Sequence, residues 1–195
     1  ELKPLYEPID RGNRLYFAGR REQNPSKPMP SDANSTMRMS YGTIKGYSPA
    51  DAVEYDYFTT SRGILEKNNP ESTEFNVFPS FLELIKKGDW GRWADKKDGK
   101  LHVAFISTND ITGGNSGSPV FDKNGRVFGL AFDGNWEAMS GDIEFEPNLQ
   151  RTIVVDIRYV LFTIDKWGKC SRLIDEMTIK SPAGTTTMKE APLTT

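Results

Sequence analysis

The sequence is short of cysteine and histidine, and it has no long hydrophobic run. Cys170 is the only cysteine among 195 residues, which excludes an internal disulfide and therefore a disulfide-stapled secreted scaffold. No stretch of about 18 apolar residues occurs, so no segment is predicted to span a membrane. Neither sign of charge dominates, because 25 Lys and Arg face 27 Asp and Glu for a net charge of −2. This balance argues against a nucleic acid or an anionic membrane as the partner.

The chain also lacks a starting methionine and a signal-peptide pattern, so we expect it to be a piece of a longer protein. Residues 1–23 show no clean helical or strand period. Residues 24–35 contain three prolines, which forbid regular structure and indicate a linker or a domain boundary. Residues 35–180 are predicted to form the folded domain, and residues 181–195 are predicted to be a flexible tail.

Within residues 35–180, alternation of apolar and polar residues predicts several half-buried strands. The predicted strands are 37–41, 53–59, 101–105, 119–121, 127–132 and 152–155. Asn124-Gly125 predicts a tight hairpin turn with positive φ at both residues. A short helix over 80–87, with Ser80 as its cap and Gly88 as its stop, and a closing helix over 157–167, capped by Asp156, complete the pattern. These elements predict an all-β, mainly antiparallel barrel or sandwich with a C-terminal helix.

The loop Gly113-Gly114-Asn115-Ser116-Gly117-Ser118-Pro119 carries the strongest chemical signal in the sequence. Amide cleavage by serine needs a freely projecting hydroxyl and two backbone N–H groups that converge on the oxyanion. Glycines allow close approach of the backbone, so Ser116 is the predicted nucleophile, and the N–H groups of Gly114 and Ser116 are the predicted oxyanion hole. The alternative is an ordinary polar loop, since glycine and serine favour loops in any case.

A serine nucleophile needs a general base, which is usually a histidine oriented by a carboxylate. His102 is the only histidine, and it lies within the predicted strand 101–105. We interpret it as an ordinary strand residue. The catalytic His and Asp are therefore expected outside this chain, and the chain alone is expected to be inactive.

Four separate segments resemble the bacterial dipeptidyl-peptidase 7 and dipeptidyl-peptidase 11 family of chymotrypsin-clan serine exopeptidases, in order and spacing. They are residues 38–47, 108–120, 129–137 and 155–159. The resemblance implies a double β-barrel with an inserted helical domain, in which residues 35–180 are the six-stranded second barrel and residues 1–34 end the helical domain. It also implies a metal- and cofactor-independent enzyme that removes dipeptides from free N-termini. The family is exported, periplasmic or surface-associated, and typically homodimeric.

The resemblance assigns roles to two further residues. Asp133 matches an acidic position that holds the substrate's α-ammonium group, although by itself it could be a turn residue before Gly134. Gly134 matches a position at which acid-specific members carry Arg, so glycine implies a pocket for an apolar residue before the cut bond. Asn115 stands where trypsin-like zymogens carry Asp, which predicts that neutral hydrogen bonds hold the loop.

Two other readings remain open: a catalytically inert barrel that acts as a binding module, and another endopeptidase of the same clan. Three further features are interpreted as structural. Trp90 and Trp93 with their basic neighbours are expected to pack in the interior rather than bind nucleic acid. The acidic run 142–146 is interpreted as an exposed edge rather than a calcium site. Cys170 has no neighbouring base and is interpreted as structural.

Overall fold

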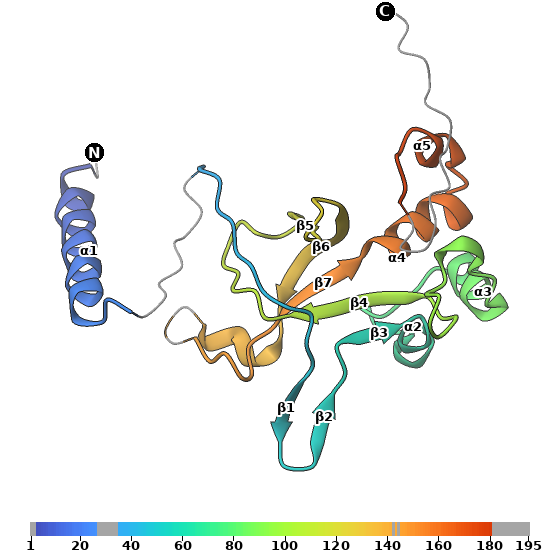
Figure 1. Ribbon diagram of the computed structural model, residues 1–195, viewed down its shortest axis with the longest axis horizontal. Coiled ribbons are helices and arrows are strands. Elements are labelled where there is room, and N and C mark those ends of the chain that lie inside the picture. Colours follow the sequence, from blue (N-terminus) through green and yellow to red (C-terminus); the bar gives the residue numbers. More distant parts are fainter. Residues whose placement is uncertain (1–2, 27–34, 142, 144, 181–195) are drawn as a thin grey trace, which may run out of the picture.

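The computed structural model describes residues 3–26, 35–141, 143 and 145–180. Its centre is a five-stranded antiparallel sheet in the order β3-β4-β7-β6-β5. The strands are β3 (Phe58–Thr60), β4 (His102–Ser107), β5 (Pro119–Phe121), β6 (Val127–Gly134) and β7 (Thr152–Asp156). A separate hairpin pairs β1 (Tyr47–Ala50) with β2 (Val53–Tyr55) and projects away from this sheet (Figure 1). The antiparallel architecture is confirmed.

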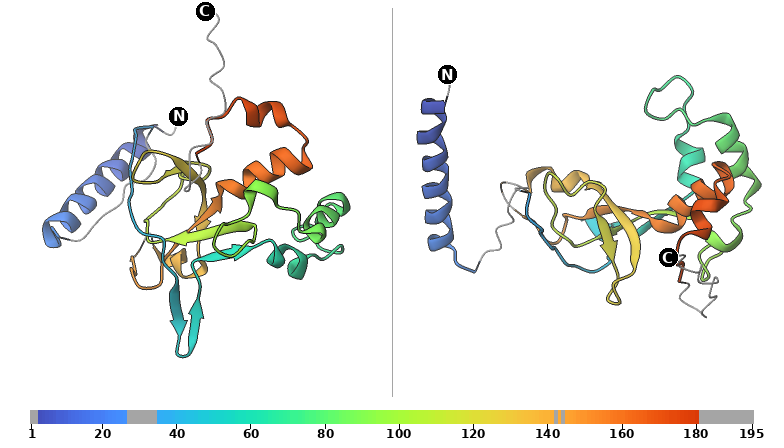
Figure 2. Two further views of the ribbon diagram at one scale, coloured as in Figure 1. Left: turned by 45° about the vertical axis from the view of Figure 1, so that its right-hand side comes forward. Right: turned by 90° about the horizontal axis from the view of Figure 1, so that it is seen from above.

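Helices gather at one end of the sheet (Figures 1 and 2). They are α2 (Arg62–Lys67), α3 (Pro79–Lys87), α4 (Ile157–Phe162) and α5 (Ser171–Asp175), with a 3-10 turn η1 (Gly91–Trp93) and a π-helical turn η3 (Thr163–Trp167). A second 3-10 helix, η2 (Trp136–Ser140), follows β6. The all-β prediction is therefore only partly right, since the described fold mixes sheets and helices.

No closed barrel is present in the described part of the chain. The outer strands β3 and β5 pair only with β4 and β6, so the sheet is open at both edges. The predicted strand 37–41 is wrong: this segment is extended coil, and its Met37, Met39 and Tyr41 side chains are 95%, 86% and 89% exposed. Strand-like pairing begins only after this segment, where Ile44 bridges Ser107 and the Thr108 N–H donates to the Thr43 carbonyl at 2.9 Å.

Residues 3–23 form a helix, α1 (Lys3–Gln23), that the residue pattern did not predict. Tyr6, Ile9, Tyr16 and Phe17 fall on one side of this helix, but the polar run 10–14 separates them and Pro8 lies inside the helix, so the period is interrupted in the sequence. Figure 1 and the right-hand view of Figure 2 show α1 apart from the sheet, and its described side chains are almost all exposed. It does not match the length and apolar composition of a membrane-crossing helix, and neither does any other helix in the described residues.

Several local predictions can be compared with the backbone. Gly88 ends α3 in the left-handed conformation with φ 67°, as predicted, but α3 begins after Phe78 with Pro79 rather than with a Ser80 cap. Asp156 caps α4 by accepting from the Arg158 N–H, as predicted, whereas the helix turns π-helical after Phe162.

The turn between β5 and β6 differs in its details from the prediction. Only Gly125 has positive φ, at 72°, and Asp122 accepts from the backbone N–H groups of Asn124 and Arg126 at 2.8 and 3.0 Å. This arrangement is a three-residue connection with glycine at its left-handed position, rather than a two-residue turn.

The largest buried cluster joins the helices to the start of β4. Its fully buried members are Phe81, Ile85, Trp93, Leu101, Leu161, Phe162 and Ile174. Trp90 packs edge-on against Phe162 at 5.6 Å, and Trp93 is 3% exposed, which confirms the structural interpretation of both tryptophans. This cluster anchors one end of β4 and β7, and the nucleophile loop leaves β4 at the other end.

Candidate active site

The Ser116 loop connects β4 to β5 and rests against β6. The Gly117 N–H donates to the Ala131 carbonyl at 2.7 Å, and the Ala131 N–H donates to the Ser118 carbonyl at 2.9 Å. These two bonds fix the loop immediately after the serine. Ser116 itself is exposed, and its hydroxyl makes one long contact of 3.4 Å, to the Phe132 carbonyl. A hydroxyl held this loosely is free to turn toward an incoming base and a substrate carbonyl.

The backbone of the loop leaves two donors unused. Gly114 and Gly117 have φ values of 93° and 79°, a conformation that only glycine adopts without strain. Within the described residues, the Gly114 and Ser116 N–H groups donate no hydrogen bond, while the Asn115 N–H donates to the Thr112 carbonyl at 3.2 Å. Two free N–H groups that flank an exposed hydroxyl are what a developing oxyanion requires.

Asn115 holds this arrangement with neutral bonds. Its side-chain oxygen accepts from the Thr112 N–H at 3.2 Å, in addition to the backbone bond between the same two residues. The prediction that the loop needs no buried salt bridge at this position agrees with these contacts.

A shift in strand register sets the position of Asp133, which follows the residue whose carbonyl Ser116 contacts. Ala131 pairs with Val154, whereas Asp133 pairs with Ile153, so Phe132 is the extra residue of a β-bulge. A bulge turns the following side chain relative to the regular alternation, and both Phe132 and Asp133 are exposed. The bulge therefore presents the Asp133 carboxylate on the surface one residue beyond the carbonyl that Ser116 contacts.

Asp133 and Gly134 are linked by a short local bond. One Asp133 carboxylate oxygen accepts from the Gly134 N–H at 2.7 Å, and the other has no partner among the described residues. The free oxygen leaves the carboxylate able to accept from a bound cation such as an ammonium group. Gly134 is half-buried and pairs with Thr152 at the end of β6.

A polar cluster that the residue pattern did not predict lies directly behind Gly134. The Asn135 side chain is buried; it accepts from the Arg151 N–H at 2.8 Å and donates to the Leu149 carbonyl and to Glu137 at 2.8 Å each. Glu137 also accepts from the Tyr47 hydroxyl at 2.8 Å. Burial raises the pKa of Tyr47. Only the turn-like composition of residues 134–137 hinted at this cluster, because its partners are more than ten residues away.

Arg151 completes that cluster as a buried cation. It is 3% exposed, and its guanidinium donates to four carbonyls, those of Lys45, Gly46, Pro147 and Gln150. Burial lowers the pKa of Arg151. The guanidinium also lies 5.5 Å from the centre of the Tyr47 ring. These bonds tie the segment before β1 to the start of β7.

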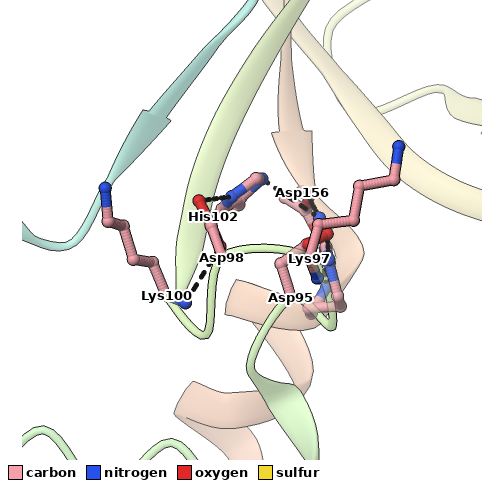
Figure 3. A network of polar contacts seen from close by, with 7 residues as sticks. Asp95, Lys97, Asp98, Lys100, His102 and Asp156 are labelled. Carbon is pink, nitrogen blue, oxygen red and sulfur yellow. Dashed lines mark hydrogen bonds and ion pairs between the residues drawn. The ribbon is translucent and has the colours of Figure 1, made fainter.

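His102 lies in a different polar network, at the other end of β4 (Figure 3). Its Nε2 is 3.0 Å from Asp98 Oδ2, and its Nδ1 is 3.4 Å from an Arg158 nitrogen. Because a carboxylate only accepts and a guanidinium only donates, this geometry fits the neutral tautomer with its proton on Nε2. The ring also stacks on Phe58 at 4.1 Å. Both ring nitrogens are engaged and neither contacts Ser116, so His102 does not serve as the base of this serine.

Arg158 is the centre of the His102 network. Its guanidinium contacts Asp156 at 2.6 Å and Asp95 at 2.5 Å. Bonds to these carboxylates raise the pKa of Arg158, those to Asp156 most strongly. The bond from Arg158 lowers the pKa of Asp95. Burial acts to raise the pKa of Asp98, but its hydrogen bonds with His102 and the Lys100 N–H outweigh burial, and the pKa is lowered.

Oxygen and nitrogen donors of Asp95, Asp98 and His102 lie within 4.8 Å of one another. A metal ion prefers such donors, but here Asp95 pairs with the Arg158 guanidinium, and Asp98 is bonded to His102 and the Lys100 N–H. The cluster is therefore satisfied as an ion-pair network. The acidic run 142–146 lies partly outside the described residues. Cys170 is exposed, and its thiol contacts the Gly168 carbonyl at 3.2 Å.

The sequence profile of the peptidase S46 family matches residues 1–179. The chain is 66% identical over 169 residues to a dipeptidyl-peptidase 7 of Porphyromonas gingivalis, covering 87% of this chain and 24% of that protein. It is 49% identical over 179 residues to an Asp/Glu-specific dipeptidyl-peptidase of the same organism, covering 92% and 25%. The chain thus spans about a quarter of the length of these relatives.

A solved structure shares the fold. The crystal structure of Porphyromonas endodontalis DPP11 in complex with the dipeptide Arg-Glu superposes with a TM-score of 0.77 at 45% identity, covering 87% of this chain and 24% of that one. Sequence and structure agree, and the chain belongs to the peptidase S46 family.

Proposed function

We propose that the full-length protein is a serine dipeptidyl aminopeptidase, which releases dipeptides from free N-termini and prefers an apolar residue before the cut bond. The observation that carries the proposal is the arrangement around Ser116. An exposed hydroxyl, two free backbone N–H groups and a surface carboxylate lie together on one loop and the adjoining strand.

The reaction is a two-step acyl transfer. Ser116 Oγ attacks the carbonyl carbon of the second substrate residue while a histidine takes the hydroxyl proton. The Gly114 and Ser116 N–H groups donate to the oxyanion that forms. The histidine then protonates the leaving amine, the C–N bond breaks, and the dipeptide stays esterified to Ser116. Water hydrolyses this ester by the same steps, which frees the dipeptide and restores the hydroxyl.

Asp133 sets the length of the fragment that is released from the substrate. An extended chain advances about 3.3 Å per residue, so the α-ammonium of a dipeptide lies about two residues from the bond that is cut. Asp133 follows the residue whose carbonyl contacts Ser116, and its free oxygen can accept from that ammonium group. The names of the relatives, dipeptidyl-peptidase 7 and Asp/Glu-specific dipeptidyl-peptidase, support dipeptide release.

The remaining groups are proposed to come from the rest of the protein. The catalytic His and Asp would lie in a first β-barrel upstream, joined through a helical domain whose end is residues 1–34. Residues 35–180 would complete a second barrel when that part is present. We also propose a homodimer and a periplasmic or surface location for the full-length protein. The isolated 195-residue chain should not hydrolyse dipeptidyl substrates, because its single histidine is engaged with Asp98 and Arg158.

The test is hydrolysis of fluorogenic dipeptides by the full-length protein, with Leu, Phe, Asp or Glu before the cut bond. Leu and Phe substrates should be cleaved best, and N-acetylated copies should not be cleaved. Ser116→Ala should lower kcat/KM by about 10³-fold or more. Preference for Asp or Glu would contradict the apolar pocket. Absence of any hydrolysis by the wild-type protein would favour the inert binding module instead.

A further inference from the structure

The structure leaves no room for a side chain at position 134. A Cβ built on Gly134 would lie 2.9 Å from the Ala138 Cβ, closer than real Cβ contacts occur. Two carbon atoms are in favourable contact at about 3.5–4.0 Å, so one of the two segments would have to move. The Gly134 backbone does not need glycine for its conformation, because its φ is not among the positive ones. The requirement for glycine at this position is therefore set by its neighbour.

Ala138 cannot relieve this contact alone. An alanine has no rotatable side chain, so its Cβ moves only with the backbone of η2. The Ala138 N–H donates to the Asn135 carbonyl at 2.9 Å, and the Gly141 N–H donates to the Ala138 carbonyl at 2.9 Å. Both bonds hold the turn that carries Ala138, so relief requires η2 to shift as a unit.

The start of η2 is itself fixed to β7 and to the β1 hairpin. The Asn135 N–H donates to the Arg151 carbonyl at 2.9 Å, and the Asn135 side chain bonds back to the Arg151 N–H. Glu137 joins Asn135 to the Tyr47 hydroxyl. Fully satisfied buried networks of this kind are rigid, because moving one member breaks several bonds. The network therefore holds Ala138 in its position next to Gly134.

We propose that Ala138 is a specificity-determining residue, which keeps position 134 free of any side chain and so keeps the space beside Ser116 open to an apolar side chain of the substrate. The inference rests on the proposed function and on the role that the family resemblance implies for Gly134, in the pocket for the residue before the cut bond. It adds that the size of this pocket is set by Gly134 and Ala138 together, and by the position of η2. A substitution at Gly134 alone reshapes the pocket by displacing η2.

The test is a double-mutant cycle in the full-length protein, with dipeptidyl substrates that carry Ala or Phe before the cut bond. Gly134→Ala should lower kcat/KM for the Phe substrate about tenfold, mainly through KM, as expected for one misplaced methyl group in a pocket. Adding Ala138→Gly should recover at least about fivefold of that loss, which is a coupling typical of residues in contact. Gly134→Ala with Met139→Ala should recover nothing, since Met139 lies in the same 3-10 helix but is 79% exposed.

Thermal unfolding separates specificity from simple stabilisation. Glycine loses more backbone freedom on folding than alanine, so Ala138→Gly in the otherwise wild-type protein should lower the unfolding temperature while the ratio of kcat/KM for Phe over Ala substrates rises. A purely structural role would make both change in the same direction. Gly63→Ala is the control for an added methyl group, because nothing lies within 4 Å of its built Cβ, and it should leave kcat/KM unchanged.

Ala138→Val provides a second test, in which Gly134 is left unchanged. The larger side chain should lower the ratio of kcat/KM for Phe over Ala substrates about tenfold. Ala138→Gly alone should raise the same ratio. Equal ratios in all three proteins, or no recovery in the double variant, would overturn this inference while leaving the proposed function intact. A wild-type protein that releases no dipeptide would overturn both.

Discussion

The chain holds two clusters of residues that commonly take part in catalysis, and they differ in how their polar atoms are used. Around Ser116, an exposed hydroxyl, two backbone N–H groups and one Asp133 oxygen have little or no partner in the described residues. Around His102, both ring nitrogens and the facing carboxylates are bonded through Asp98 and Arg158. The pairing of His102 with Asp98 is therefore no evidence of catalysis here, whereas the unused donors beside the exposed Ser116 hydroxyl support its proposed role as the nucleophile.

The difference follows from position in the fold. The His102 network lies where β4 and β7 meet the helical cluster, and burial there requires each polar group to be bonded. The Ser116 loop leaves the opposite end of β4, outside that cluster, and only the bonds to β6 hold it. One end of the sheet is held by the buried cluster and its ion pairs, and the other is the end proposed to present groups to a substrate.

The largest difference in activity should come from removing the serine of one cluster and, separately, the histidine of the other. In the full-length protein, Ser116→Ala should lower kcat/KM by about 10³-fold or more, whereas His102→Phe should change it less than about threefold. Phenylalanine keeps the stack on Phe58 and removes both nitrogens. A loss of activity in His102→Phe as large as that in Ser116→Ala, with an unchanged unfolding temperature, would show that His102 takes part in the reaction.

Asp133→Asn should have the next largest effect. It removes the charge that is proposed to hold the substrate ammonium group and keeps the shape of the side chain. kcat/KM should fall about 100-fold, mostly through KM, as is typical when one partner of a close charge pair is neutralised. Asp122→Asn is the matched control, because Asp122 is a half-buried carboxylate of the β5–β6 turn that also accepts from backbone N–H groups. An unchanged KM for Asp133→Asn would contradict the assigned role.

Arg158→Met should destabilise the protein and leave the Ser116 loop intact. It leaves the Asp156 carboxylate, whose side chain is 7% exposed, without its cation. We expect the free energy of unfolding to fall by about 3 kcal/mol, measured by chemical denaturation with tryptophan fluorescence. Lys86→Met, which removes an exposed pair with Glu83, should change it by less than about 0.5 kcal/mol. Equal effects of the two substitutions would contradict the structural role of the His102 network.

The smallest effect is a dependence of stability on pH. The pKa values of Asp95 and Asp98 are lowered from the ordinary value of 3.8, so their contribution to stability is complete above that pH. It is lost as the pH falls through the lower folded-state values. The denaturation midpoint should therefore drop below pH 3.8, and Asp95→Asn with Asp98→Asn should flatten the drop. A wild-type midpoint that stays constant in this range would contradict these shifts.

The sequence predicted the elements whose signals are local. The Ser116 loop, the Gly88 stop and the Asp156 cap each depend on a few adjacent residues, and the structure places them as expected. The strand over 37–41 failed because alternation alone does not supply a neighbouring surface to pack on. The helix α1 was not predicted, because Pro8 and the polar run 10–14 interrupt the spacing of its apolar residues.

The parts that could not be predicted depend on contacts between distant segments. Arg151 bonds to Lys45 and Gly46, more than one hundred positions earlier. Arg158 joins Asp95 to Asp156. The bulge at Phe132, which sets the direction of Asp133, depends on the register between β6 and β7. No residue pattern within one segment encodes such pairings.

Covalent labelling tests the central claim most directly. A fluorophosphonate reacts with an activated serine by forming an O–P bond and releasing fluoride, and the site is found by peptide mapping of the full-length protein. We predict a single labelled residue, Ser116, with labelling abolished in Ser116→Ala and retained in His102→Phe. Labelling at another serine, or none at Ser116 in a protein that releases dipeptides, would contradict the account.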